Sequence, residues 1–248
     1  MDVLSVLGLL LGAAALFGGN LLEGGHVSAL INGSAFIIVF GGTLGAAMLQ
    51  TPLPVFKRAF AIVSWVLKPP LVDLTKVRKQ LVNWGQRSRK DGLLGLEGIA
   101  ETEQRHFYKQ GLMLLVDGTE PDTIRDVLQT DLMLQERADL EAAKVFDAMG
   151  GYAPTIGIIG AVLGLIHVMG NLGDPSQLGA GIATAFVATI YGVAAANLIF
   201  IPIGQKLRAT VRELALEKEL VIDGLVAIAE GENPRIIEMR LTTYQQAS

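Results

Sequence analysis

The sequence predicts an all-α membrane protein with four transmembrane helices in two hairpins, a helical cytoplasmic domain between spans two and three, and a cytoplasmic C-terminal helix. Half of the 248 residues are hydrophobic and only 18% are charged, which is a more apolar balance than a soluble domain usually has. Four apolar segments without Asp, Glu, Lys or Arg reach the ~20 residues that cross a bilayer. They are residues 3–22, 29–49, 152–170 and 181–203.

The basic residues predict the orientation of these spans. All 20 Lys and Arg lie in residues 51–150 and 204–248, and the short polar links 23–28 and 171–177 hold none. Because basic flanks stay in the cytoplasm, we expect external links and two cytoplasmic termini. The first residues lack the basic start of a cleavable signal peptide, so we expect none. The expected parts are a hairpin at 1–50, a cytoplasmic domain at 51–150, a hairpin at 151–203 and a tail at 204–248.

The middle segment is expected to be helical. Ile124, Val127 and Leu128 have the i, i+3, i+4 spacing of a helix face. Asp122 or Thr123 is the expected cap of this helix, because a short polar oxygen can accept the free N–H groups at a helix start. Charged helices are expected at 132–148, leading into the third span, and at 205–230, leading out of the fourth, packed against each other.

Residues 54–68 predict an amphipathic helix lying on the inner membrane surface. Pro69 and Pro70 would end it. The alternative is a helix buried in the cytoplasmic domain, and the surface position is favoured because the basic flank would face anionic lipid. One face carries Phe56, Phe60, Val63 and Leu67, and another carries Lys57, Ser64 and Lys68.

The third and fourth spans each carry one face of small residues. Such faces let helix backbones approach closely in lipid, so ordinary helix packing explains them as well as a pathway wall does. The face of span three is Ala153, Gly157, Gly160 and Gly164, and that of span four is Ala185, Thr189, Gly192 and Ala196.

Two prolines and two threonines suggest more than packing. Pro154 and Pro202 lie near the inner ends of the third and fourth spans, where each removes a backbone donor and can bend its helix. The hydroxyls of Thr155 and Thr189 could line a partly hydrated path. The alternative for each threonine is a hydrogen bond to its own helix backbone.

Ionisable groups are missing where an ion carrier would need them. Proton relays inside membranes usually use carboxylates or basic side chains, and the spans contain none. His26, His106 and His167 are expected to be solvated or at an interface. If the protein conducts protons, the titrating group must therefore come from a partner; if it conducts nothing, the small faces hold a bundle.

No sequence feature predicts an enzyme. Cysteine is absent, which excludes disulfides, thiolate metal sites and cysteine nucleophiles. The sequence also offers no metal-ligand cluster and no phosphate-binding loop, so we expect no cofactor, no metal and no nucleic-acid partner.

The chain resembles the MotA family of flagellar stator subunits, within the MotA/TolQ/ExbB proton-channel group. The most specific stretch is APTIGIIGAVLG at 153–164, and two spans before the cytoplasmic domain favour MotA over TolQ or ExbB, which have one. Further matching stretches are GGN at 18–20, FGGTL at 40–44, GDP at 173–175, ATIYG at 188–192 and NLIFIP at 197–202.

The resemblance implies a homopentamer in the bacterial inner membrane around two helices of a MotB-type partner, whose membrane aspartate carries the ion. It implies that Pro154 and Pro202 couple ion passage to movement of the cytoplasmic part. It also implies that Thr189 is a polar pore residue and that Thr155 and Phe186 face the partner helices.

The resemblance bears on the ion and on the rotor as well. Sodium-type members carry a threonine where this chain has Ala161, and loss of that oxygen ligand predicts proton rather than sodium coupling. Arg89 and Glu97, in the segment 87–97, match the charged pair that meets the rotor protein FliG. The alternatives to a stator subunit are a TolQ/ExbB-type energy-transducing channel subunit and a non-conducting membrane scaffold, and for Arg89 and Glu97 a solvated helix surface.

Overall fold

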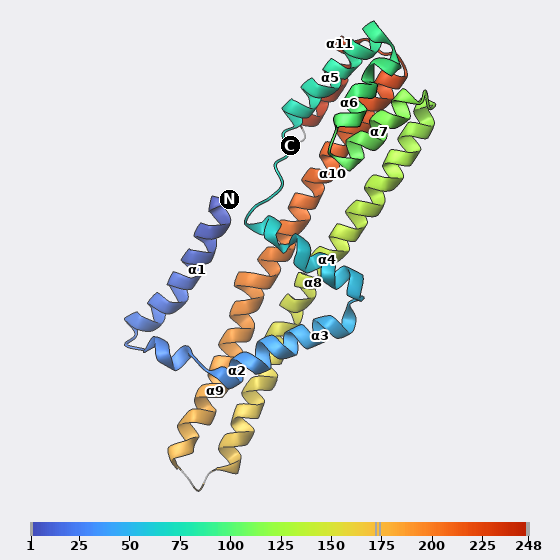
Figure 1. Cartoon of the computed structure of the whole chain (residues 1–248). Helices are drawn as coiled ribbons and strands as arrows, with labels where there is room; N and C mark the ends of the chain where they lie inside the picture. The colour runs from blue at the N-terminus through green and yellow to red at the C-terminus, as the bar shows by residue number, and fades with distance from the viewer. Residues whose placement is uncertain (1, 172, 174, 247–248) are drawn as a thin grey trace. The chain divides into compact units, whose positions relative to one another are not determined.

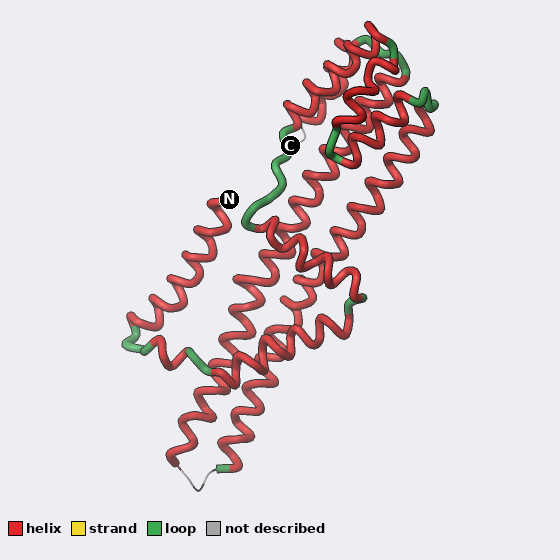
Figure 2. Tube along the Cα trace, viewed as in Figure 1, coloured by secondary structure: helices red, strands yellow, loops and turns green. Residues whose placement is uncertain are grey.

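The computed structural model describes residues 2–171, 173 and 175–246 (Figure 1). Within these ranges every regular element is a helix (Figure 2), which confirms the all-α class. The chain divides into two compact units, described separately below. The first unit is Met1–Pro69 with Ala138–Ala209, and the second unit is Pro70–Arg137 with Thr210–Ser248. This division cuts across the consecutive segments 1–50, 51–150, 151–203 and 204–248, because two long helices run from one unit into the other.

Four helical stretches of the described chain are long and apolar enough to cross a membrane, in agreement with the four predicted spans. The pairing of the spans into hairpins and the side on which the termini lie remain predictions. Leu172 and Asp174, in the predicted second link and in the GDP stretch, lie outside the described residues. The four stretches are Val3–Leu22, Val27–Gln50, a part of Pro121–Gly170 and a part of Leu178–Ala229.

Helix α1 (Val3–Leu22) begins at Asp2, whose carboxylate accepts the N–H of Leu4 at 3.2 Å. None of its residues is buried. An apolar helix with no buried face must contact lipid or other subunits, since water would be an unfavourable surrounding. Its attachment to the first unit includes the ion pair between Asp2 and Lys206.

The second predicted span is confirmed as a stretch of membrane-crossing length, but it is not one continuous α-helix. A 3₁₀ turn η1 (Val27–Leu30) ends before Asn32, and helix starts again there because the Asn32 side chain accepts the Ala35 N–H at 3.0 Å. An asparagine oxygen in this position replaces a helix bond and favours a new N-terminus. The following elements are α2 (Gly33–Phe36), the π-helical η2 (Ile37–Gly41) and α3 (Gly42–Gln50).

Helix α4 (Leu53–Ile62) and the 3₁₀ turn η3 (Val63–Val66) correspond to the predicted helix 54–68, whose α-helical part ends earlier than expected. Ala59 and Ile62 are buried in the first unit, and the Phe60 ring lies 5.8 Å from that of Phe146. The helix therefore packs in the unit that holds the predicted spans rather than in the core of the second unit. Its position on a membrane surface remains a prediction.

Helix α8 (Pro121–Gly170) is 50 residues long, so the charged helix expected at 132–148 does continue into the third span. It starts at Pro121, one or two positions before the predicted caps. Proline suits a first helical position because its φ is already helical and its missing N–H has no partner there in any case. Pro154 lies inside the helix without ending it.

The fourth span continues into the C-terminal segment in the same way. Helix α9 (Pro175–Ala194) passes through the π-helical η5 (Ala195–Phe200) into α10 (Ile201–Ala229). This continuity agrees with the helix expected at 205–230. The chain then turns at Gly231 (φ +72°) into α11 (Pro234–Thr242) and η6 (Thr243–Gln246).

The second unit has a core of large apolar side chains. Tyr108, buried in this core, donates its hydroxyl to Glu217 at 2.5 Å, and burial together with this bond raises the pKa of the tyrosine. Leu81, Leu112, Leu128, Leu225 and Ile237 are fully buried. Besides parts of α8 and α10, the second unit contains α5 (Leu74–Asp91), η4 (Leu93–Leu96), α6 (Glu97–Thr102), α7 (His106–Val116) and α11.

Candidate functional site

The glycine faces of α8 and α9 lie against each other in the first unit. A Cβ added at Gly157 would lie 2.8 Å from the carbonyl oxygen of Ala188, and one at Gly192 would lie 2.5 Å from that of Ala153. These distances are shorter than carbon–oxygen contact allows, so only glycine lets the two backbones approach this closely. Gly164 is similar, with the Gly181 oxygen 2.8 Å from its added Cβ.

Gly160 lies at a contact of three elements rather than two. A Cβ added there would meet the Cβ of Ala188 at 2.7 Å and the Cγ2 of Ile38, in η2, at 3.2 Å. A Cβ at Gly42 would in turn lie 2.9 Å from the Cγ2 of Ile156. The second membrane stretch therefore packs on the α8–α9 pair at the middle of the glycine face.

The hydroxyls of both candidate threonines are bonded within their own helices. Thr155 Oγ1 donates to the carbonyl of Tyr152 at 2.8 Å, and Thr189 Oγ1 donates to that of Ala185 at 3.2 Å. Thr155 is exposed, and it follows Ala153 by two positions, about 200° around the helix from the glycine face. Thr189 is half-buried at that face. Within one chain the two hydroxyls therefore do not share a site.

Helix α9 presents an exposed strip beside the glycine face. Phe186 is 70% exposed, and Ile190, Val193 and Asn197 follow it at the i+4, i+7 and i+11 positions, all of them exposed. Ile190, Val193 and Asn197 also line a groove of about 520 Å³ together with Thr189 and, from α1, Leu16. On α8, Ala161 is half-buried, seven positions after Pro154 and on the same helix face.

A polar cluster closes the helix break of the second membrane stretch. The Tyr191 hydroxyl donates to the carbonyl of Leu30 at 2.5 Å and accepts the Asn32 N–H at 3.3 Å. The Asn32 amide also donates to the Thr184 hydroxyl at 2.8 Å. These bonds satisfy backbone groups that the break leaves free, as an apolar environment requires. The sequence signal was Asn32 before Gly33 within an apolar run, which our sequence analysis included in the span.

A π-helical turn directly precedes the second candidate proline. In η5 the Ile201 N–H bonds to the Ala196 carbonyl, five residues back. Pro202, which is exposed, follows at once. A proline has no N–H and crowds the carbonyl four residues earlier, and the wider turn accommodates it without ending the helix. The sequence points to Pro202 but not to this turn, because π-helical turns have no simple residue pattern.

Among the described residues, three ion pairs join different elements of the first unit outside the predicted spans. Arg58 binds Asp139 with two bonds, Nε–Oδ1 at 2.6 Å and Nη2–Oδ2 at 3.1 Å. The hydrogen bond to Asp139 raises the pKa of Arg58. Arg208 pairs with Asp147, and Lys206 with Asp2. In the part of the chain that the structure describes, no group of three or more His, Asp or Glu side chains could hold a metal ion.

The candidate rotor-facing pair lies on two sides of a sharp turn in the second unit. Arg89 is exposed in the last turn of α5, and Glu97 is exposed at the first position of α6. Gly92 between them has φ +72°, a conformation that favours glycine. A cation at a helix end and a carboxylate at a helix start both match the helix dipole.

Comparisons with known proteins give consistent results along the chain. The profile described as "Motility protein A N-terminal" matches residues 6–83, and that of the "MotA/TolQ/ExbB proton channel family" matches residues 99–220. A motility protein A of Helicobacter pylori is 35% identical over 244 residues, which cover 98% of this chain and 95% of the relative.

Two solved structures are also similar over nearly the whole chain. The MotAB structure of C. jejuni matches with a TM-score of 0.93 and 34% identity, covering 98% of this chain and 96% of the matched one. The flagellar MotAB stator complex from Bacillus subtilis matches with a TM-score of 0.86 and 32% identity, covering 96% and 94%.

Proposed function

The chain belongs to the MotA/TolQ/ExbB proton channel family and is a flagellar motor stator subunit, and from this premise we propose that it works with a MotB-type partner to convert proton flow into torque. Its four apolar stretches make it a multi-pass inner-membrane protein. The proposed assembly is a homopentamer around two partner helices, with both termini in the cytoplasm and α4 against the inner lipid surface.

One observation supports the partner most directly: the membrane stretches pack closely yet contain no carboxylate. The α8–α9 contact is filled by backbone, and Asp, Glu, Lys and Arg are all absent from residues 152–170 and 181–203. A proton carrier in such a wall needs a titrating group. We assign this group to an aspartate of the MotB-type partner, held beside Phe186 and the exposed strip of α9.

The proposed cycle uses this chain's residues to guide and transmit. A proton from outside neutralises the partner aspartate, which removes the cost of holding a charge against an apolar wall. The ring then steps relative to the partner, and the proton leaves inward past Thr189 and Thr155. Pro154 and Pro202 pass the step to the cytoplasmic part, and Arg89 and Glu97 pass it to FliG.

Thr189→Ala and Pro154→Ala test the pathway against a mere scaffold. Each is expected to reduce swimming while the variant still copurifies with the partner. Normal swimming of both variants would favour a non-conducting scaffold. Accessibility labelling of the two termini from the cytoplasm tests the orientation, and native mass spectrometry of the purified complex tests the pentamer.

Ala161 makes the choice of ion testable. A sodium site needs several oxygen ligands, and an alanine supplies none. Exchange of external sodium for potassium at a constant proton gradient should leave swimming speed unchanged. A requirement for sodium would contradict proton coupling without affecting the stator assignment.

Charge reversal tests the rotor contact. Arg89→Glu and Glu97→Lys are each expected to reduce torque, because the contact to FliG is proposed to be electrostatic. An opposite reversal in FliG should restore part of the loss. If no charge reversal in FliG restores torque to either variant, Arg89 and Glu97 are ordinary solvated surface residues.

A further inference from the structure

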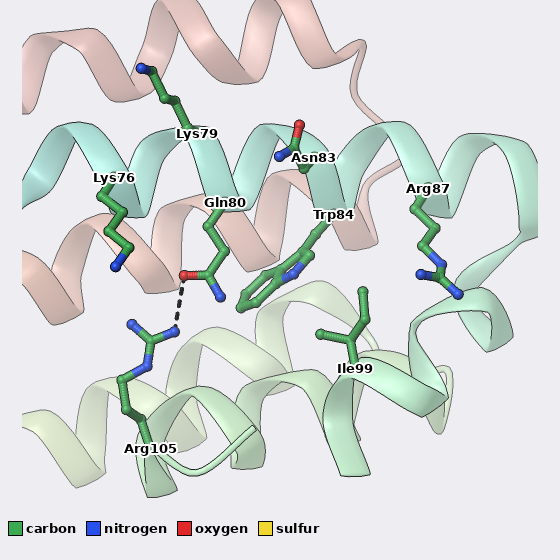
Figure 3. A pocket seen from close by; sticks show the side chains of 8 residues that line it. All are labelled: Lys76, Lys79, Gln80, Asn83, Trp84, Arg87, Ile99 and Arg105. Atoms are coloured by element: carbon green, nitrogen blue, oxygen red, sulfur yellow. Dashed lines mark hydrogen bonds between the residues drawn. The ribbon is translucent and has the colours of Figure 1, made fainter. Parts of the chain in front are cut away.

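The second unit carries a groove of about 780 Å³ on one side of α5, closed by α6 and the start of α7 (Figure 3). Lys76 and Arg87 point toward it from the two ends of the drawn part of α5, with Trp84 between them. Ile99 from α6 and Arg105, directly before α7, lie across from α5. Lys79, Gln80 and Asn83 of α5 also line the groove.

The groove is basic in a chain with a net charge of −4. Four of its lining residues are cations, the fourth besides Lys76, Arg87 and Arg105 being Lys79. Only Arg105 is neutralised, because it donates to Glu103 at 2.9 and 2.8 Å, and these bonds lower the pKa of that carboxyl.

Arg105 is also held in place by neutral groups. Its Nη2 donates to Gln80 Oε1 at 2.9 Å, and its guanidinium lies 3.5 Å from the centre of the Tyr108 ring. Lys76, Lys79 and Arg87 are exposed, and no carboxylate among the described residues is within ion-pair distance of them. Lys79 points away from Arg105 and Ile99 in Figure 3, so the available cations that face the fixed Arg105 are Lys76 and Arg87.

The spacing of these cations indicates the shape of a ligand. Lys76 and Arg87 are eleven residues apart on one helix face, which corresponds to about 16 Å at a rise of ~1.5 Å per residue. A phosphate site instead gathers its donors at one point, usually backbone N–H groups of a loop or helix start. Cations spread along a helix, with apolar Ile99 and the edge of Trp84 between them, match a segment that carries several carboxylates and an apolar side chain.

We propose that this groove binds an acidic helical segment of a protein partner. Carboxylates of that segment pair with Lys76 and Arg87, and an apolar side chain lies on Ile99. Arg89 follows Arg87 by two positions, about 200° around α5, and neither Arg89 nor Glu97 lines the groove. The groove therefore shares neither residue of the proposed charged rotor pair, although Arg87 begins the segment 87–97, and the two contacts are tested by different variants.

The test is a binding titration with the purified full chain in complex with its MotB-type partner. The probe is a fluorescein-labelled alanine-based helical peptide with glutamates at i, i+4, i+7 and i+11, and its matched control has glutamine at these positions. Fluorescence anisotropy should show binding of the glutamate peptide that weakens with added salt. Equal binding of the glutamine peptide would overturn the proposal, and so would no binding of either.

Variants locate the binding on the protein. Lys76→Glu with Arg87→Glu should weaken peptide binding at least tenfold, and Lys76→Gln with Arg87→Gln should weaken it less. Arg212→Glu is the matched control, because Arg212 is an exposed arginine of the second unit outside the groove. Circular dichroism and gel filtration check that each variant is folded. An equal loss in the Arg212 variant would show non-specific charge attraction and contradict the proposal.

A phosphate ligand is the competing occupant. Inorganic pyrophosphate serves as its probe, measured by calorimetry with the same proteins. The groove is a phosphate site, and the proposal is overturned, if three results coincide. Pyrophosphate binds the parent protein, it does not bind the variant with Lys76→Glu and Arg87→Glu, and the glutamate peptide binds neither protein. The acidic segment is supported if the glutamate peptide binds and pyrophosphate weakens this binding no more than a simple salt of equal ionic strength does.

Discussion

Glycine lies at helix contacts in both units, but it meets different neighbours. In the first unit, a Cβ at Gly192 would face the Ala153 carbonyl oxygen and, at 3.1 Å, the Cα of Gly157. In the second unit, a Cβ at Gly224 would face the methyl ends of Leu81, the nearest at 2.7 Å. At Gly192 the helices of the first unit therefore touch through backbone, whereas Gly224 in the second unit makes room for a leucine.

The large apolar side chains show the same difference. In the first unit many of them point outward, with Leu11 73%, Phe186 70% and Ile166 60% exposed, while in the second unit Leu81 and Leu112 are fully buried. The hydrophobic effect can hold the second unit together in water. The first unit needs lipid or partner subunits to cover its surface, and close packing holds its helices where lipid removes the hydrophobic drive.

The largest predicted effect comes from Gly192→Ala. The new methyl group meets backbone atoms of Ala153 and Gly157 in α8, so α8 and α9 must move apart, at a cost near the upper end of the ~1–3 kcal/mol typical of overpacking. Loss of swimming and a lower unfolding temperature of the detergent-solubilised complex would show it.

Gly224→Ala is the matched change in the second unit. Leu81 can change rotamer, and alanine gains ~1 kcal/mol of helix propensity over glycine, so we expect a net change below that amount. Gly45→Ala, in α3 with no atom within 4 Å of the added Cβ, controls for propensity alone. Equal destabilisation by the Gly192 and Gly224 variants would break the distinction between the two kinds of contact.

The next effect concerns charge in the first unit. Asp139 is 8% exposed and forms two bonds with Arg58. Asp139→Asn removes the charge and one of the bonds, and since Arg58 is half-exposed we expect a loss of about 1–2 kcal/mol. Chemical denaturation followed by circular dichroism measures it.

The exposed pair of Lys144 and Glu141 in α8 provides the control for Asp139→Asn. Glu141→Gln is expected to cost less than ~0.5 kcal/mol, because both partners are solvated. A loss as large as that of the Asp139 variant would mean that burial does not distinguish the two pairs.

Acid should weaken the second unit through Glu103. Its pKa is lowered from 4.5, mainly by the hydrogen bonds from Arg105. A lowered folded pKa means stability that is present above the unfolded value and is lost as pH falls through the folded one. Arg105 is partly exposed, so we expect a loss below ~1 kcal/mol, and this loss should develop below pH 4.5.

Trp84 fluorescence in a Trp65→Phe background can report this acid effect, because the chain has two tryptophans and Trp84 lies in the second unit. As the pH falls from neutral to well below 4.5, the Glu103→Gln variant should lose less stability than the parent protein. An unchanged decrease would show that other carboxylates account for it.

The smallest predicted effect is a gain in stability, from the substitution of Glu219. Burial, and then the nearby charges of Glu136 and Asp223, raise the pKa of Glu219. A carboxyl with a raised folded pKa contributes stability below the unfolded value and loses it as pH rises through the folded one. Glu219→Gln should therefore stabilise the second unit at neutral pH by ~0.5 kcal/mol or less.

The pH dependence separates this from a general effect of glutamine. The gain from Glu219→Gln should vanish below pH 4.5, the ordinary value of this carboxyl, when the glutamate is protonated. Glu213→Gln, an exposed change in α10, is the control for the glutamine substitution itself. A gain that persists at low pH would contradict electrostatic repulsion as its cause.

Local patterns in the sequence predicted most of the fold. The four apolar stretches and the charged helix 132–148 were confirmed because span length and charge can be read within one window of the chain. The break at Asn32 was missed, since its partners Thr184 and Tyr191 lie more than 150 positions away. Polar groups that satisfy each other across such distances leave no local pattern.

The candidate site was predictable in part. Residue spacing identified the glycine faces, but only the coordinates show that Gly192 meets Ala153 and Gly157 while Gly160 also meets Ile38. The hydroxyls of Thr155 and Thr189 each donate a hydrogen bond to a carbonyl of their own helix. This bond was the alternative to a role in lining a hydrated path. Their part in ion passage, like that of Phe186, remains a prediction.

The sequence by itself determined the helical class, the four membrane stretches and the absence of a membrane carboxylate, because composition and period need no knowledge of distant contacts. Tertiary structure alone decided which backbone each glycine approaches, where the second stretch breaks, and that Lys76, Arg87 and Arg105 line one groove. Those features depend on residues far apart in the chain meeting at atomic distances, where a single methyl group or hydrogen bond changes the outcome.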